Sequence, residues 1–279
     1  MAAIGAQAGG VGVSLELLLA LLALGIATGF LAGLLGIGGG MLLVPFLTAL
    51  LQAKGVAEAL AVKMAIATSM ACIVATATSS LRAHHRRGAV RWDLVRGLAP
   101  GVVLGGLLSG AGLFAVLKGQ VLAGGFAAFV GVSAWQMWRG AQPRPSRTMP
   151  AWPGQVAVGG GIGLLSGLVG AGGGFASVPF MAWCNVPIHQ AVATSAALGL
   201  PIAAASTLGY VISGWNLPAA LPGAWGYLYL PALACLMPVT VMMAPWGAKA
   251  AHALPIAQLK RAFALVLAAL AAYMLTKAL

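Results

Sequence analysis

The stretch GLLGIGGGMLLVPF, residues 33–46, lies in a segment that is otherwise almost entirely Leu, Ala and Val. Five glycines and a proline disfavour a continuous helix, because each interior Gly costs about 0.5–1 kcal/mol relative to Ala and Pro removes a hydrogen-bond donor. A second stretch, GLVGAGGGFASVPF, follows at residues 167–180, and nine of its fourteen positions are identical at a constant offset of 134. The chain therefore interrupts two apolar segments in the same way.

The composition predicts a membrane protein built from helices. Of the 279 residues, 61% are hydrophobic and 6% are charged, whereas a soluble protein carries about 25% charged residues. Several apolar runs reach the roughly 20 residues that cross a hydrocarbon core, and a transmembrane barrel would instead show alternating segments of about 10 residues. The net charge is +12. Most of the cations stand in short loops, which is typical of membrane orientation rather than of nucleic-acid binding.

The sequence predicts two halves of similar layout. A polar, Pro-containing linker at residues 139–154 separates a first membrane repeat, 1–138, from a second, 155–279. The motif AIATSM (65–70) aligns with AVATSA (191–196), which extends the duplication beyond the glycines. Eight apolar segments are expected at 14–51 (broken at the glycines), 58–81, 94–117, 120–138, 155–184 (broken at the glycines), 188–212, 227–246 and 258–278.

The positive charges predict how the halves are oriented. Eleven of the fifteen cations fall into groups that we assign to the cytoplasmic side, because cytoplasmic loops are rich in Lys and Arg. These are Arg82, Arg86, Arg87, Arg91, Arg96, Arg139, Arg144, Arg147, Lys249, Lys260 and Arg261. The loop after the second segment is basic in the first half (82–91) and uncharged in the second (213–226). The repeats are therefore predicted to be inverted, with both termini outside the cytoplasmic (inner) membrane of a bacterium.

An inverted pair of repeats requires an odd number of crossings in each half. Three continuous spans meet this requirement only if the broken segment enters and leaves on the same side. We therefore predict an all-α polytopic membrane protein in which each repeat is a re-entrant, glycine-tipped helical hairpin plus three transmembrane helices. Non-helical backbone at membrane depth is tolerated only where protein or a polar cavity surrounds it. Two such tips near the midplane are typical of the binding site of a secondary transporter.

The glycine tips are the first candidate binding residues. After each tip the chain is expected to return as a short helix whose first N–H groups have no partner and whose dipole end is positive. Because glycine has no Cβ, a small anion can approach this backbone closely. The predicted substrate-binding glycines are Gly38, Gly39, Gly40, Gly172, Gly173 and Gly174.

The Thr-Ser pair that follows each tip supplies the second set of candidates, Thr68, Ser69, Thr194 and Ser195. Counting about 1.5 Å per residue from Glu58 places Thr68 about 15 Å deep, which is half of a ~30 Å core. Hydroxyl groups near that depth would be neutral donors to an oxyanion. The alternative is that they bond to carbonyl groups of their own helices.

Other polar residues carry weaker signals. Lys63 and His189 occupy equivalent positions and are either possible entrance cations for an anion or a snorkelling Lys and an interfacial His. The three acids, Glu16, Glu58 and Asp93, fall near the ends of spans, which argues against coupling through mid-membrane carboxylates and against a hydrolase. The three cysteines show no metal-ligand spacing. We expect no metal, no cofactor and no enzymatic activity.

The residues GFLAGLLGIGGGMLLVPFL (29–47) and GLLSGLVGAGGGFASVPFM (163–181), with the ATS that follows each, resemble the TauE/SafE sulfite exporter family. The resemblance covers nearly the whole chain, including the duplication and the basic loop. It implies a carrier of the cytoplasmic membrane for small sulfur-containing anions such as sulfite, sulfoacetate or related organosulfonates, often acting as an exporter. The positions that match the family pattern are the two glycine tips and the two Thr-Ser pairs.

We therefore expect a membrane transporter that binds a small sulfur-containing anion near the midplane, at helix N-termini. Its expected partners are this anionic substrate and the lipid bilayer, with no nucleic acid, and the sequence assigns no oligomeric state. Two alternatives use the same features. One is an anion channel with the same pore, and the other is a membrane-embedded accessory subunit that transports nothing by itself.

Overall fold

The computed structural model of the chain describes residues 15–35, 39–140, 146–250 and 256–279. These residues are helical almost throughout, and a short β-hairpin joins β1 (Ala224–Trp225) to β2 (Leu228–Tyr229). The helices are α1 Leu15–Leu35, α2 Gly40–Ala53, α3 Glu58–His85, α4 Trp92–Leu107, the π-helix η1 Leu108–Leu113, α5 Phe114–Val116, α6 Gly119–Arg139, α7 Trp152–Val169, α8 Gly174–Trp183, α9 Ile188–Gly214, α10 Leu230–Ala250 and α11 Ile256–Thr276. The predicted all-α fold class is confirmed.

Five of the described helical segments are long and apolar enough to cross a membrane. They are Glu58–His85, Trp92–Val116, Gly119–Arg139, Ile188–Gly214 and Leu230–Gly247. Each coincides with one of the continuous spans predicted from the sequence. The sixth predicted span, 258–278, falls on α11, whose described apolar part is Phe263–Thr276. The chain is therefore a polytopic membrane protein, as predicted.

All eight tryptophans are exposed on the surface of the molecule. Trp92 and Trp152 begin α4 and α7, whereas Trp183 ends α8 and Trp215 directly follows α9. Trp is enriched at the two interfaces between a membrane and water, because its ring is apolar and its N–H is polar. The tryptophans at these helix ends fit a molecule whose apolar middle faces lipid.

The centre of the fold is the crossing of α3 and α9. Helix α2 packs on α3 and α8 packs on α9, while α10 also contacts α3 and α4 contacts α9. On the periphery α1 packs on α10, α7 packs on α4, and α6 packs on α11. The packing partners in the first half thus correspond to those in the second half. The pairs α1–α10 and α4–α7 each join helices from different halves.

The backbones of α4 and α7 approach each other at glycines. A Cβ on Gly101 would collide with the Val156 carbonyl oxygen, and a Cβ on Gly105 would collide with the Gly160 carbonyl oxygen. Small residues allow this close approach, which is a common way to associate helices in a membrane. The contact fixes the position of α7 and of the turn that follows it.

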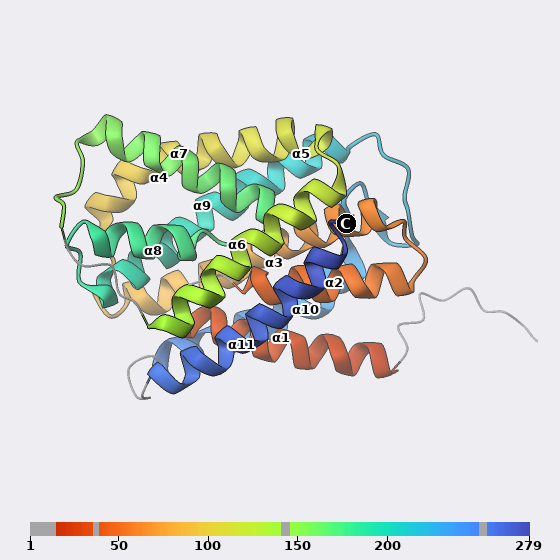
Figure 1. Ribbon diagram of the computed structural model, residues 1–279, viewed down its shortest axis with the longest axis horizontal. Helices are drawn as coiled ribbons and strands as arrows, with labels where there is room; N and C mark the ends of the chain where they lie inside the picture. The colour runs from red at the N-terminus through yellow and green to blue at the C-terminus, as the bar shows by residue number, and fades with distance from the viewer. Residues whose placement is uncertain (1–14, 36–38, 141–145, 251–255) are drawn as a thin grey trace, which may run out of the picture.

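The two broken segments form helical hairpins that point in opposite directions. In Figure 1, α1 begins and α2 ends on the right of the molecule, whereas α7 begins and α8 ends on the left. Helices α2 and α8 both start in the interior of the molecule (Figure 1). The start of each return helix is therefore surrounded by other helices.

Candidate functional site

The first glycine turn leads into α2 through Gly39. This residue has φ of 73° and ψ of −10°, in the left-handed region that glycine adopts without a steric penalty. A Cβ at Gly39 would lie 2.9 Å from the Thr28 carbonyl oxygen. The predicted binding residue Gly38 lies outside the described residues, whereas Gly40 is buried as the first residue of α2.

Gly173, which precedes α8, has the same backbone conformation as Gly39. Gly173 has φ of 77° and ψ of −12°, and α8 begins at Gly174. The carbonyl oxygen of Gly173 accepts the N–H groups of Ala176 at 3.1 Å and Ser177 at 2.9 Å. A Cβ at Gly173 would collide with Cδ1 of Ile202 on α9. Both turns therefore require glycine at the position that precedes the return helix.

The two turns meet between α3 and α9. A Cβ on Gly40 would collide with the Gly170 carbonyl oxygen at the start of the second turn. Ser69 on α3 donates its hydroxyl to the same carbonyl oxygen at 3.4 Å. On the other side, a Cβ on Gly199 of α9 would lie 3.3 Å from the Gly172 carbonyl oxygen. The predicted residues Ser69, Gly40 and Gly172 are thus brought together at one place.

The starts of α2 and α8 favour negative charge. In a helix the first N–H groups have no intrahelical acceptor, and the aligned peptide dipoles place a partial positive charge at this end. Helix α2 has 14 residues and α8 has 10, with no acidic residue in the first turn of either helix. This arrangement suits a small anion, provided that other donors lie nearby.

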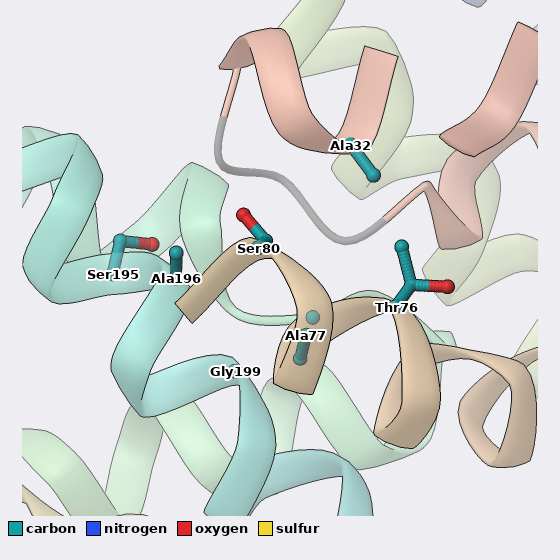
Figure 2. Close-up of a pocket in the computed structure, with 8 residues that line it drawn as sticks. Ala32, Thr76, Ala77, Ser80, Ser195, Ala196 and Gly199 are labelled. Atoms are coloured by element: carbon teal, nitrogen blue, oxygen red, sulfur yellow. The ribbon is translucent and has the colours of Figure 1, made fainter. Parts of the chain in front are cut away.

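A small pocket lies beside the second turn. It is lined by Ala32, Thr76, Ala77, Ser80, Gly172, Ser195, Ala196 and Gly199, which come from α1, α3, the turn and α9. Figure 2 shows Ser80 and Ser195 on facing sides of the pocket, with the Ser195 hydroxyl turned toward Ser80. Two of the predicted binding residues, Gly172 and Ser195, therefore line the same pocket.

Ser80 is the most informative residue of the pocket. Its side chain is buried, and its hydroxyl oxygen makes no hydrogen bond within the described part of the chain. Buried polar groups are almost always paired, so this hydroxyl needs a partner from outside the chain, such as a water molecule, an ion or a substrate. Thr76, one helical turn away, already bonds to the Thr240 hydroxyl at 2.9 Å, and Ser195 accepts the Ser177 hydroxyl at 2.9 Å.

Sequence reasoning missed Thr76 and Ser80. The signal was present as the run TATSS, residues 76–80, which places four hydroxyl groups in an otherwise apolar span. It has no equivalent in the second half except Ser206, at the same offset of 126 as the Thr-Ser pairs. The search for features shared by both halves therefore passed over it.

The two predicted threonines lie outside the pocket lining. Thr68 accepts the backbone N–H of Tyr229 at 3.0 Å, directly before α10. Thr194 accepts the backbone N–H of Arg91 at 3.0 Å, directly before α4. Each threonine therefore holds the start of a helix from the other half. A role for these hydroxyls in anion binding stays a prediction.

The two predicted entrance cations also lie away from the pocket lining. Lys63 is half-buried and donates to the Ala115 carbonyl oxygen at 3.0 Å. Its Nζ lies 5.9 Å from the centre of the Phe114 ring and 5.8 Å from that of Tyr227. His189 is exposed in the first turn of α9. Among the described residues, no three His, Cys, Asp or Glu side chains are grouped as a metal site would require.

Comparison with known proteins gives a family and two relatives. Residues 21–274 match the model of the family described as sulfite exporter TauE/SafE. The chain is 35% identical over 257 residues to a probable membrane transporter protein of Haemophilus influenzae, covering 92% of this chain and 97% of that protein. It is 28% identical over 186 residues to a probable membrane transporter protein of Methanocaldococcus jannaschii, covering 65% of this chain and 67% of that protein. No solved structure matches the chain. The family match includes both glycine turns and the whole pocket.

Proposed function

Because the chain belongs to the TauE/SafE sulfite exporter family and is thus a membrane transporter, we propose that it carries a small sulfur-containing oxyanion, such as sulfite or an organosulfonate, out of a bacterial cell. The observation that carries this proposal is the pocket beside the second glycine turn. There the buried Ser80 hydroxyl has no partner among the described residues, and Ser80 lines the same pocket as Gly172 of the turn that precedes α8.

The donors around this pocket suit an oxyanion. The oxygens of sulfite and of sulfonates accept hydrogen bonds, and the pocket lining offers hydroxyl groups and no carboxylate. The partial positive charge at the start of α8 adds attraction without a titratable cation. We assign direct contacts to Ser80, Ser195 and the backbone at Gly172–Gly174, with Gly39 and Gly40 in the adjoining turn.

The remaining predicted residues act at a distance in this proposal. Thr68 and Thr194 hold the starts of α10 and α4 through backbone N–H groups, and Ser69 supports the second turn through Gly170. These bonds keep the turns in the geometry that exposes their N–H groups. We therefore treat these three residues as positioning residues.

The size of the pocket favours a carrier over a channel. It offers space for about one water molecule, and sulfite is larger than that. The surrounding helices must therefore separate before the anion binds, which is what an alternating-access carrier does. The opposite directions of the two hairpins in Figure 1 support the inverted repeats that such carriers use.

Uptake into proteoliposomes tests the proposal. The purified protein is reconstituted, and uptake of labelled sulfite, sulfoacetate, thiosulfate, sulfate and acetate is compared with that of empty liposomes. We expect saturable uptake of one or more sulfur anions and little uptake of acetate. Preloading the liposomes with unlabelled substrate should accelerate this uptake, because a carrier exchanges its substrate across the membrane.

Three results would contradict the proposal. Uptake of acetate equal to that of the sulfur anions would exclude selectivity for sulfur-containing anions. An uptake rate that increases linearly with substrate concentration and is the same with and without preloaded substrate would identify a channel. No uptake of any of these anions by folded protein would favour the accessory-subunit alternative.

A further inference from the structure

A second cluster of buried hydroxyl groups lies on the other side of the second glycine turn. It consists of Ser109 in the π-helix η1 and of Ser206 and Tyr210 on α9, and all three side chains are fully buried. The pocket uses the first half of α9, up to Gly199. Ser206 lies seven residues further along, which is about 10 Å of helix. Between the two sites, Ile202 faces Gly173.

The two serines converge on Gly167 of α7. A Cβ on Gly167 would collide with the Ser109 Oγ and would lie 2.9 Å from the Ser206 Oγ. The Ser109 oxygen makes no hydrogen bond among the described residues, whereas Ser206 has a side-chain hydrogen bond with Tyr210, one turn along α9. An unpaired hydroxyl at a buried place costs stability, because it has lost its water without gaining a partner. The π-helix supports a functional role for this place, since such segments occur frequently at functional sites.

The second cluster repeats a feature of the pocket. Ser206 stands at the offset of 126 from Ser80 that also relates Thr194 to Thr68. Both serines are buried. Ser80 lacks a hydrogen-bond partner in the described parts of the chain, and Ser206 is bonded to Tyr210 of its own helix. The pocket and the second cluster therefore present equivalent serines, one on each central helix.

Aromatic side chains close the second cluster on its far side. The Tyr210 hydroxyl donates to the Gly167 carbonyl oxygen. The Phe114 ring lies 4.4 Å from the Tyr210 ring and 5.2 Å from the Tyr227 ring, measured between centroids. The Lys63 amine lies next to the Phe114 and Tyr227 rings. A cation thus stands behind the aromatic group, where it would attract an anion.

We propose that Ser109 and Ser206 form a second binding position for the transported oxyanion, between the pocket and Lys63. This inference rests on the proposed function. The two serine hydroxyls donate to oxygens of the anion after it leaves the Ser80 pocket. The group of Phe114, Tyr210 and Tyr227 closes this position from the side of Lys63 and opens when Tyr210 releases the Gly167 carbonyl.

Two alanine variants and their double variant test the proposal. In Ser109→Ala and Ser206→Ala, we expect the kcat for labelled sulfite uptake into proteoliposomes to fall about tenfold, which is the loss expected for one hydrogen bond to a charged group. The KM should change little, because the Ser80 pocket is intact. The Tm of Ser109→Ala should stay the same or rise by about 2 °C, because an unpaired buried hydroxyl has been removed.

Ser133→Ala is the matched control. Ser133 is also a buried serine, but its hydroxyl donates to the Phe129 carbonyl oxygen of its own helix at 2.8 Å. We expect this variant to keep its uptake kinetics.

A kcat that is unchanged in both single variants and in the double variant would overturn the second binding position, while uptake by the wild-type protein would still uphold the proposed function. A Tm that falls in proportion to kcat would also overturn it, since the serines would then be structural. No uptake by the wild-type protein would overturn both proposals.

Discussion

Gly39 and Gly173 are the residues on which both turns depend. At φ near 75° a Cβ meets the following carbonyl oxygen, so an L-residue other than glycine is strained by about 1–2 kcal/mol. The surroundings add a second constraint, because a Cβ at Gly173 would collide with Ile202. Conformation and packing therefore demand the same residue type at this position.

Gly173→Ala should lower the free energy of unfolding by about 1–2 kcal/mol and reduce sulfite uptake at least tenfold, because alanine is strained at φ of 77° and its Cβ displaces the Ile202 side chain beside the start of α8. Thermal unfolding in detergent and uptake into proteoliposomes measure the two effects. Gly161→Ala is the control, since a Cβ at Gly161 meets nothing within 4 Å and its helix gains from alanine. Normal uptake by the Gly173 variant would refute the role of the second turn.

Ser80→Ala should raise the KM for sulfite about tenfold without lowering the Tm, because a substrate contact is lost and no protein hydrogen bond is broken. The neighbouring Ser79→Ala is the control. Ser79 donates to the Val241 carbonyl oxygen at 2.9 Å, so its loss should cost about 0.5–1.5 kcal/mol of stability and leave the KM unchanged. The KM is measured from uptake at increasing sulfite concentrations, and the Tm of both variants from thermal scans. A KM of Ser80→Ala equal to that of the wild-type protein would exclude Ser80 from the binding site.

At the scale of elements, two hydrogen bonds of the same kind tie the halves together. Thr68 on α3 accepts an N–H at the start of α10, and Thr194 on α9 accepts an N–H at the start of α4. Helices α10 and α4 in turn pack on α1 and α7, which lead into the glycine turns. A displacement of either threonine bond is therefore transmitted to a hairpin.

Thr68→Val should lower the free energy of unfolding by about 1–3 kcal/mol, because it leaves the buried Tyr229 N–H without its acceptor. Thr194→Val should have a smaller effect of the same sign, because the Arg91 N–H is only half-buried. The Ser variants at the same positions keep the hydroxyl and should restore most of the stability. Denaturant or thermal unfolding of the reconstituted variants measures this difference. Unfolding midpoints that are equal for the Val and Ser variants would show that the two hydrogen bonds do not contribute to the stability of the protein.

At the scale of the whole molecule, the two hairpins point in opposite directions and the basic loop 82–91 lies at the end where α7 begins. In Figure 1, α3 ends and α4 and α7 begin on the left, next to the loop 82–91. The loop 213–226 connects α9 to α10 and carries no charge. If the left end faces the cytoplasm, the positive-inside rule and the inverted repeats agree.

Cysteine labelling tests this orientation. Arg86 and Asn216 are exposed residues in the two loops, and the native Cys72 and Cys184 are buried. In spheroplasts, whose cytoplasmic membrane is intact, a membrane-impermeant thiol reagent should label Asn216→Cys. It should label Arg86→Cys only after the membrane is permeabilised. Labelling of both variants from the same side would refute the inverted repeats.

Much of the fold could be predicted because its determinants are local. The apolar spans follow from hydropathy, and the breaks at Gly39 and Gly173 were predicted from glycine clusters that recur in both halves. Clustered glycines alone do not end a helix, since Gly159–Gly161 lie within α7. The candidate site was only partly predictable. Gly172 and Ser195 were found because they recur within matching runs of both halves. Thr76 was missed because the second half carries Ile202 in its place, and Ser80 was missed because its equivalent, Ser206, is a single serine outside any repeated run.

By itself, the sequence determined that this protein crosses a membrane, where its helices run and where two glycine turns interrupt them. These properties depend on residues close together in the chain. Only the tertiary structure decided which hydroxyls are already used. Thr68 and Thr194 are bonded to backbone groups more than one hundred residues away, whereas Ser80, which lines the pocket with Gly172, has no partner among the described residues. Whether a buried hydroxyl is paired depends on what the packing of distant helices places next to it, and local sequence does not specify this.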